Sequence, residues 1–449
     1  PNVAGSVSDA DLFSYIAKMR QGYEGNILYQ NRYTIEESSP TALFIFYTIL
    51  GNLSRFFSVN LVLFYFIANY ICDLILILGL GLFNSHFFKS KKWVLITIFM
   101  ICFSTGYSFL YILFPGLSIN QFGNDISADV IIPEFSTFTS IMDVCHFPFC
   151  ISLMLFIFFI IIKNSENNLY YFLLSVLTFC LGLVHPFDFV TVFSVSFVFL
   201  CIQLFIYKDV LYKKNILKFI FPFVIGFLPV LYINYILNTN IILKLTFKDM
   251  NILTSLPITS YFMGYGTNFL LAALGILYIF RKKIILNKEI VFLLVWIITN
   301  FILLYSPFDF QRRFVMGLQI PIVILSMITL NTIFEKEQII RKFIISFIVV
   351  ITCFTSTFLI LNERASKIFF FIDSDILSLY KWINNNNISN KNFFSYDYMG
   401  TFTPAFSSNR VFLGHWCETD NFKGRRELVN KFFNFFSKKQ IKFLKDINI

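Results

Sequence analysis

Residues 59–83 read VNLVLFYFIANYICDLILILGLGLF, and they indicate the class of protein. The run is long enough to cross a bilayer as a helix, since about 20 apolar residues suffice. Asp73 is its single charged residue. Nine more apolar runs follow, at 93–114, 147–162, 169–184, 187–207, 216–237, 269–280, 289–305, 314–334 and 343–361. The sequence therefore predicts an all-α polytopic membrane bundle of about ten spans over residues 59–361. The shorter runs either extend into their loops or form broken helices that line a cavity.

The composition agrees with a membrane bundle. Of the 449 residues, 57% are hydrophobic and 14% are charged, whereas a soluble domain carries about 25% charged residues. The formal net charge is +10. The basic residues lie in short loops between apolar runs, so they indicate topology and not a nucleic-acid partner. The eight cysteines are scattered, mostly within apolar runs, and predict neither a metal site nor a disulfide framework.

Basic residues occur in every second loop and orient the bundle. They cluster at 89–92, 163, 208–214, 281–288 and 336–342. Because cytoplasmic loops carry the excess of Lys and Arg, these loops are expected in the cytoplasm and the alternate loops outside it. The same alternation of cytoplasmic and outer loops places residues 1–58 outside the membrane, which predicts one further span upstream of the sequence. The chain is thus expected to be a multi-pass protein of the plasma (inner) membrane, embedded in the lipid bilayer, with its active site extracytoplasmic.

Two polar segments flank the bundle. Residues 1–58 are predicted to form an extracytoplasmic first loop, in which 41–57 is an amphipathic helix on the outer membrane surface. Residues 362–449 are predicted to form a small extracytoplasmic α/β C-terminal domain, which is expected to be incomplete because no strand follows its final helix. Its expected elements are strands at 392–396 and 410–413 and a charged helix from about 422 to 437.

The first loop carries two carboxylates, Asp9 and Asp11, two residues apart. Side chains two apart in an extended loop point the same way. Both could then meet one hydroxyl or one divalent cation, for which carboxylates are the usual ligands. The alternative is that Ser8 or Asp9 caps a helix that begins near Asp11.

Two stretches resemble a known superfamily. The first loop resembles that of polytopic glycosyltransferases of the GT-C fold, in Asp9–Tyr15, Gly22–Asn26, Tyr33–Glu36 and Pro40. The stretch RVFLGHWCET, from Arg410 to Thr419, resembles a segment that follows the last span in uncharacterised bacterial membrane proteins of that superfamily. The layout of the whole chain is also similar. This resemblance implies that Asp9 or Asp11 is the catalytic base, or that Asp11 is a ligand of a divalent metal ion such as Mg²⁺ or Mn²⁺.

Two short motifs at the outer rim pair histidine with aspartate. His185 and Asp188 flank Pro186, which breaks a continuing helix. They could bind metal or phosphate, or form a hairpin turn capped by Asp188. Asp143 and His146 are three residues apart and would share a helix face. They are candidate metal ligands or, alternatively, a solvated helix start.

The remaining candidates would bind substrate. Arg312 and Arg313 lie in an outer loop, where the positive-inside pattern disfavours arginine. Guanidinium groups bind phosphate oxygens in pairs of hydrogen bonds, so these arginines could hold the phosphate of a polyprenyl-phosphate donor. The alternative is pairing with Asp309 or with lipid headgroups. In the tail, His415, Trp416 and Glu418 could bind an acceptor sugar, or else form a buried strand end.

Together these features predict an enzyme: a membrane glycosyltransferase acting outside the cytoplasm. It would move a sugar from a polyprenyl-phosphate-linked donor to a hydroxyl of a glycan, lipid or protein acceptor. The sequence contains no Walker loop and no dinucleotide glycine fingerprint, which fits a lipid-borne donor. The main alternative is a transporter or flippase of a lipid-linked saccharide, which typically shows internal repeats. A lipid-linked polymerase or ligase is a further alternative.

Overall fold

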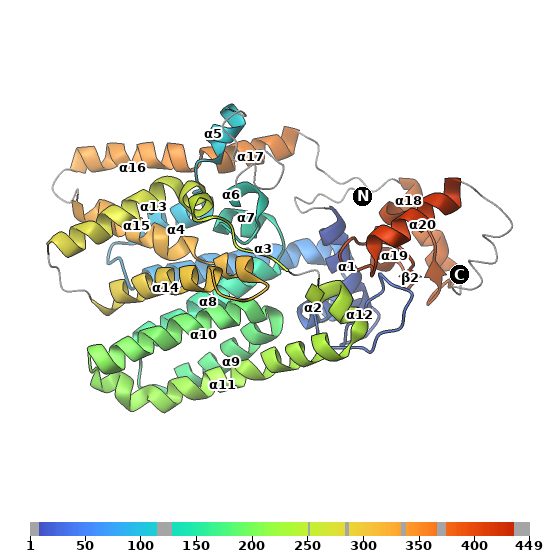
Figure 1. Cartoon of the computed structure of the whole chain (residues 1–449), viewed down its shortest axis with the longest axis horizontal. Coiled ribbons are helices and arrows are strands. Elements are labelled where there is room, and N and C mark those ends of the chain that lie inside the picture. The colour runs from blue at the N-terminus through green and yellow to red at the C-terminus, as the bar shows by residue number, and fades with distance from the viewer. Residues whose placement is uncertain are drawn as a thin grey trace. The chain divides into compact units, whose positions relative to one another are not determined.

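Nearly all of the regular structure is helical (Figure 1). The computed structural model describes residues 9–114, 128–249, 252–282, 287–333, 338–365 and 374–434. The chain divides into two compact units. Unit 1 takes in Pro1–Asn69, Leu231–Ile252 and Lys367–Ile449, and unit 2 takes in Tyr70–Val230 and Leu253–Ser366.

Unit 2 contains most of the apolar helices. It holds α4 (Lys91–Phe103), α5 (Ser108–Leu113), α6 (Ala128–Ile131), α7 (Thr137–Met142), α8 (His146–Lys163), α9 (Asn168–Val184), α10 (Pro186–Cys201), η2 (Ile202–Ile206), α13 (Ile258–Arg281), α14 (Lys288–Leu304), η5 (Gln311–Val315), α15 (Gln319–Ile333), α16 (Gln338–Thr352) and α17 (Phe354–Ala365). Two long helices, α3 (Leu61–Asn84) and α11 (Val210–Thr239), have residues in both units.

Six helical segments among the described residues are long and apolar enough to cross a membrane. They are Leu61–Asn84, His146–Lys163, Pro186–Ile206, Val210–Thr239, Ile258–Arg281 and Gln311–Ile333. A seventh arises if Lys342–Thr352 and Phe354–Leu361, which meet at a 42° bend, count as one broken span. The chain thus has the helices of a multi-pass membrane protein. The number is below the ten predicted, because several predicted runs form shorter helices.

The run predicted at 93–114 shows why one span is lost. Its helix α4 ends at Phe103, and α5 begins only at Ser108. Between them, a Cβ on Gly106 would collide with the backbone oxygen of Met263 in α13. The chain passes so close to α13 that it leaves the helical path at this point. Hydropathy alone does not reveal this break.

Aromatic packing fills the core of unit 2. Helix α8 is apolar around its whole circumference, and such a helix is stable only when it is enclosed by others. Its Phe158 packs edge-on against Trp296 of α14 with ring centroids 4.6 Å apart. Phe292 of α14 lies 5.0 Å from the same phenylalanine. These contacts place α8 and α14 side by side within the bundle.

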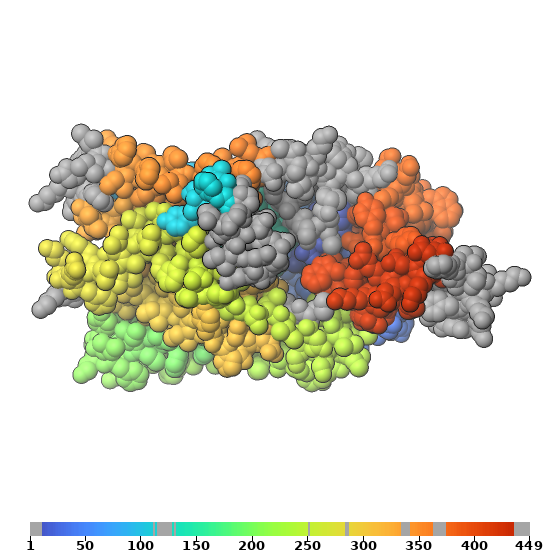
Figure 2. All heavy atoms as spheres, turned by 45° about the horizontal axis from the view of Figure 1, so that its top comes forward, coloured from blue at the N-terminus to red at the C-terminus, as the bar shows by residue number. Residues whose placement is uncertain are grey.

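Unit 1 combines the start of the chain with its tail. It holds α1 (Asp9–Tyr23), α2 (Ile45–Phe56), α12 (Ile241–Leu243), η3 (Lys244–Lys248), α18 (Ser374–Asn385), β1 (Asn392–Phe393), α19 (Asp397–Phe406), β2 (Arg410–Val411) and α20 (Phe422–Asn434). The two strands pair in parallel, Asn392 with Arg410, and α19 connects them. They lie inside the predicted strand ranges but are only two residues long. The tail elements α18 to α20 form one continuous surface, orange to red in Figure 2.

Buried contacts join the first loop to the tail within unit 1. Phe13 of α1 packs against Phe402 of α19 with ring centroids 4.6 Å apart. Arg425 of α20 donates hydrogen bonds to the backbone oxygen of Phe412 at 3.0 Å and to Glu36 at 2.6 Å. Because Arg425 is only 6% exposed, its charge depends on these partners. The two ends of the sequence therefore fold as one unit.

Helices α1 and α2 cross at two glycines. A Cβ on Gly22 would collide with the backbone oxygen of Thr48, and a Cβ on Gly51 with that of Met19. The two helices therefore approach backbone to backbone. On the other side of α2, Ile49, Leu53 and Phe56 are exposed, which leaves an apolar face like that predicted for the membrane-surface helix.

Replacing Gly51 with alanine is expected to destabilise unit 1 by about 1–3 kcal/mol, because the added methyl group forces α1 and α2 apart. Thermal unfolding of the purified protein measures this loss. Gly81→Ala is the matched control, since the nearest atom to its new Cβ would lie 3.9 Å away. Equal unfolding temperatures for the two variants would contradict the close crossing.

Candidate functional site

Asp9 and Asp11 lie in the first turn of helix α1, and not in an extended loop. Residues two apart in an α-helix are separated by about 200° around its axis. The prediction of an extended loop, on which a shared cation depended, is therefore wrong. The alternative prediction of a helix that begins near these residues agrees better with the structure. The Asp9 side chain lies outside the described part of the chain.

Asp11 contacts the tail through His415. Its Oδ1 lies 2.9 Å from Nε2 of His415, and the other ring nitrogen, Nδ1, lies 3.3 Å from Sγ of Cys417. The imidazole is 2% exposed, whereas the Asp11 side chain is 41% exposed. The first segment of the sequence and the tail segment around His415 thus meet in unit 1.

The surroundings of His415 favour its charged form. Burial alone would lower its pKa, but the hydrogen bonds to Asp11 and Cys417 raise the pKa of His415 to about 10. The negative charge of Glu418 acts in the same direction. At neutral pH the ring is therefore a cation with Asp11 as its counter-ion.

Glu418 forms the buried anchor of this tail segment. Its carboxylate accepts hydrogen bonds from Lys18 Nζ at 2.7 Å, from the Tyr29 hydroxyl at 2.9 Å and from the Ser14 hydroxyl. Burial alone would raise the pKa of Glu418, but the charges of Lys18 and His415 hold it below its usual range. At 2% exposure, Glu418 positions the tail segment and has no open path to a sugar. Trp416 is 50% exposed and does have one.

Three residues of this site were not predicted from the sequence: Ser14, Lys18 and Cys417. Ser14 and Lys18 follow Asp11 by three and seven residues, a spacing that puts all three on one helix face. A helical reading of the first loop would have found them. Cys417 stands between Trp416 and Glu418, which were both singled out, but its contact with His415 depends on the local turn.

The His415 pair predicts a pH-dependent stability. The pKa of His415 is raised in the folded state from 6.5 to about 10, so the folded state binds the proton more tightly than the unfolded chain. Its stabilising effect is fully present below about pH 6.5 and is lost as the pH rises through about 10. The stability gap between wild type and His415→Asn should therefore shrink over this range. Unfolding followed by circular dichroism measures it, and a gap that widens with pH would contradict the pairing.

In unit 2 a second set of charged residues is buried near the ends of the helices. Arg313 in η5 forms an ion pair with Glu134. His185 Nδ1 lies 3.0 Å from Asp188 Oδ2, and the rings of His185 and His146 have centroids 5.8 Å apart. Burial alone would raise the pKa of Glu134, but the charges of Arg313, Arg312 and His185 hold it below its usual range. Four segments of the chain thus contribute to one cluster.

This cluster changes the interpretation of the arginines. The sequence suggested that the arginines could pair with Asp309. In the structure, Arg313 forms its ion pair with Glu134 instead. Arg312 donates its backbone N–H to the Leu253 oxygen at 3.0 Å, and its Nε has no hydrogen-bond partner among the described residues. Because Arg313 is already paired with Glu134, Arg312 is the better candidate for a phosphate ligand.

The structure gives no support to a metal site at the predicted ligands. Among the described residues, no three His, Cys, Asp or Glu side chains lie close enough together to hold an ion. Asp11, moreover, faces a cationic imidazole. Asp143 and His146 lie at adjacent helix ends, the C-terminus of α7 and the start of α8.

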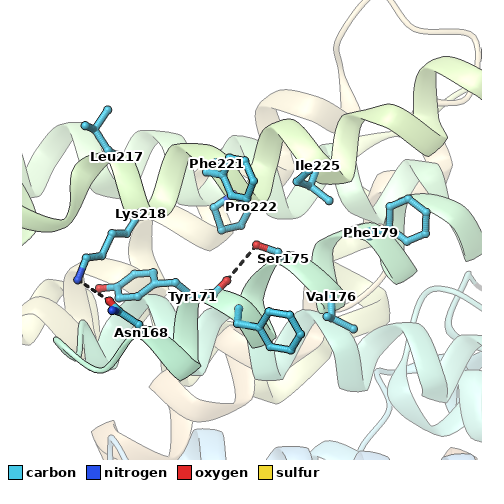
Figure 3. Close-up of a pocket in the computed structure, with 11 residues that line it drawn as sticks. Asn168, Tyr171, Ser175, Val176, Phe179, Leu217, Lys218, Phe221, Pro222 and Ile225 are labelled. Carbon is cyan, nitrogen blue, oxygen red and sulfur yellow. Dashed lines mark hydrogen bonds between the residues drawn. The ribbon is translucent and has the colours of Figure 1, made fainter.

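An open apolar groove of about 720 Å³ runs between α9 and α11 in unit 2 (Figure 3). Phe172, Val176 and Phe221 line it, and Lys218 lies at one end with a 2.9 Å hydrogen bond to Asn168. Apolar surface of this kind suits contact with lipid chains. None of the residues predicted to form the site lies in this groove.

Comparison with known proteins adds no relative. No protein-family model matches the chain, and no curated protein sequence matches it either. The resemblance to GT-C enzymes therefore stays a prediction from the sequence.

Proposed function

We propose that this protein is a membrane glycosyltransferase that moves a sugar from a polyprenyl-phosphate donor to an acceptor hydroxyl outside the cytoplasm. The observation that carries the proposal is the 2.9 Å contact between Asp11 and His415. It joins the two stretches that resemble GT-C enzymes, and it gives a carboxylate at the protein surface a fixed partner.

Asp11 is the proposed general base. Its side chain is 41% exposed, so an acceptor hydroxyl can reach it. The acceptor oxygen attacks the anomeric carbon of the donor and forms the new glycosidic bond, while the bond to the phosphate oxygen breaks. The hydroxyl proton passes to Asp11. His415 holds the carboxylate in place and supplies a positive charge beside it.

The role of a divalent ion is not supported at this carboxylate. A cation bound by Asp11 would be repelled by the imidazolium of His415. The proposed reaction at Asp11 therefore uses no metal ion.

Donor choice tests this proposal. Membranes that contain the full-length protein would be supplied with the same labelled sugar either on polyprenyl phosphate or on a nucleotide. Label should reach a hydroxyl acceptor from the lipid donor only, because a nucleotide sugar has no hydrocarbon chain to hold it at the membrane. Transfer from the nucleotide sugar alone would contradict the proposal.

A transporter or flippase of a lipid-linked saccharide is the second candidate. The buried charged cluster in unit 2 favours it, since ionisable residues within membrane helices commonly mark a transport path. His185 and Asp188, which are 6% and 0% exposed, belong to that cluster. A flippase would carry the labelled lipid across the bilayer with the sugar still attached, so analysis of both lipid and sugar after the same assay separates the two functions.

A further inference from the structure

A thiol, an imidazole and a carboxylate lie in line in unit 1. Cys417 Sγ is 3.3 Å from Nδ1 of His415, and Nε2 of the same ring is 2.9 Å from Asp11 Oδ1. In covalent catalysis a nucleophile contacts a base, and a third group orients the base. Cys417, His415 and Asp11 fulfil these three geometric requirements. Sugar transfer from a phosphate donor makes no use of the thiol.

The turn that carries the thiol and the imidazole is rigidly held. Thr419 donates its backbone N–H to the oxygen of His415 at 2.9 Å, and its hydroxyl accepts the N–H of Gly414 at 3.1 Å. Glu418, between Cys417 and Thr419, is anchored on Lys18 of α1 at 2.7 Å. The positions of the sulfur and the ring relative to Asp11 are thereby fixed before any substrate binds, as catalysis requires.

The position of the thiol also allows access. Cys417 is half-buried, and its neighbour Trp416 is 50% exposed. The exposed indole, whose centroid lies 6.1 Å from that of the His415 ring, offers an apolar surface of the kind that suits a hydrocarbon chain. By contrast, Cys180 is equally half-buried but lies within the apolar helix α9.

We propose that Cys417 is the nucleophile of an acyl-transfer site whose substrate is a carboxylic ester with an apolar acyl chain. This goes beyond the proposed sugar transfer and does not depend on it, although both use Asp11 and His415.

The step is a displacement at the carbonyl carbon. The form of the pair that attacks carries the proton on His415 Nδ1 and none on Sγ. Sγ attacks the carbonyl carbon, a C–S bond forms, and the ester C–O bond breaks. The leaving alcohol takes its proton from Nδ1. A water or hydroxyl acceptor then attacks the thioester and gives its proton to His415, and the C–S bond breaks to restore the starting pair.

The test uses p-nitrophenyl butyrate as the ester and the full chain in detergent. We expect a burst of about one nitrophenolate per protein, together with a butyryl group on the peptide that contains Cys417. Within the same wild-type sample, Cys417 should be acylated at least about 10-fold faster than Cys180, because only the former has an imidazole in contact. This internal comparison needs no variant and so does not depend on the folding of one.

Variants then test the triad. Cys417→Ala should abolish the burst, and His415→Gln should slow it by about 100-fold, the contribution of a general acid or base. Cys180→Ala is the matched control and should keep the burst. Equal acylation of Cys417 and Cys180, or an unchanged burst in His415→Gln, would overturn the proposal. No sugar donor is present, so the result is independent of glycosyl transfer.

Discussion

Glu418→Gln is expected to lower the free energy of unfolding of unit 1 by about 3–5 kcal/mol, the usual cost of removing one partner from a buried ion pair. The substitution keeps the size of the side chain but removes its charge. Lys18, which is 1% exposed, would then be left as a buried cation without its 2.7 Å partner. The hydroxyls of Ser14 and Tyr29 would also lose a charged acceptor.

Chemical unfolding followed by circular dichroism measures this loss. Lys18→Met should be destabilised to a similar extent, whereas the double variant Lys18→Met/Glu418→Leu should regain most of the stability because no charge stays buried. Lys214→Met is the matched control, since its ion pair with Glu166 is solvent-exposed and should contribute nothing measurable. If Glu418→Gln were as stable as this control, the stabilising role of the buried Glu418–Lys18 pair would be disproved.

Asp11→Asn is expected to lower the rate constant of sugar transfer by about 10²–10⁴-fold, the range associated with loss of a general base. An amide cannot accept the proton of the acceptor hydroxyl, and it removes the counter-ion of His415. The loss should appear in kcat more than in KM, because Asp11 is proposed to act in the chemical step. Initial rates in membranes with equal amounts of inserted protein measure it.

Glu37→Gln supplies the matched control for this prediction. Glu37 lies in the same first segment and is 91% exposed, with only a 3.8 Å ion pair to Arg410. Its substitution removes one negative charge without touching the Asp11–His415 pair, so transfer should continue at the wild-type rate. An equal loss in both variants would indicate that general surface charge, and not the base at Asp11, controls the rate.

Hydropathy was sufficient to predict the class of the protein but not the number of spans. The long run at 59–83 became α3, because a segment so uniformly apolar has few alternatives to a helix. The run at 93–114 was equally apolar, yet it breaks near Gly106 where the backbone meets that of Met263. A contact between segments more than 150 residues apart cannot be predicted from the local composition of either segment.

The candidate site was predictable in its residues and not in its connections. Asp11 and His415 each stood out through a short motif, but they are 404 positions apart and nothing local indicates that they meet. Because Asp9 and Asp11 were expected in an extended loop, the helix face that Asp11 shares with Lys18 was not predicted. Glu418 was predicted as a possible sugar ligand, whereas burial and the bond to Lys18 make it structural.

The fate of the labelled sugar in wild-type and Asp11→Asn membranes tests the central claim most directly. Both membranes would receive the same labelled polyprenyl-phosphate sugar and the same hydroxyl acceptor. The account predicts that label leaves the lipid for the acceptor with the wild type and stays on the lipid with Asp11→Asn. Equal transfer by the two proteins would contradict the role of Asp11. Labelled lipid that crosses the bilayer with its sugar still attached would contradict the glycosyltransferase itself.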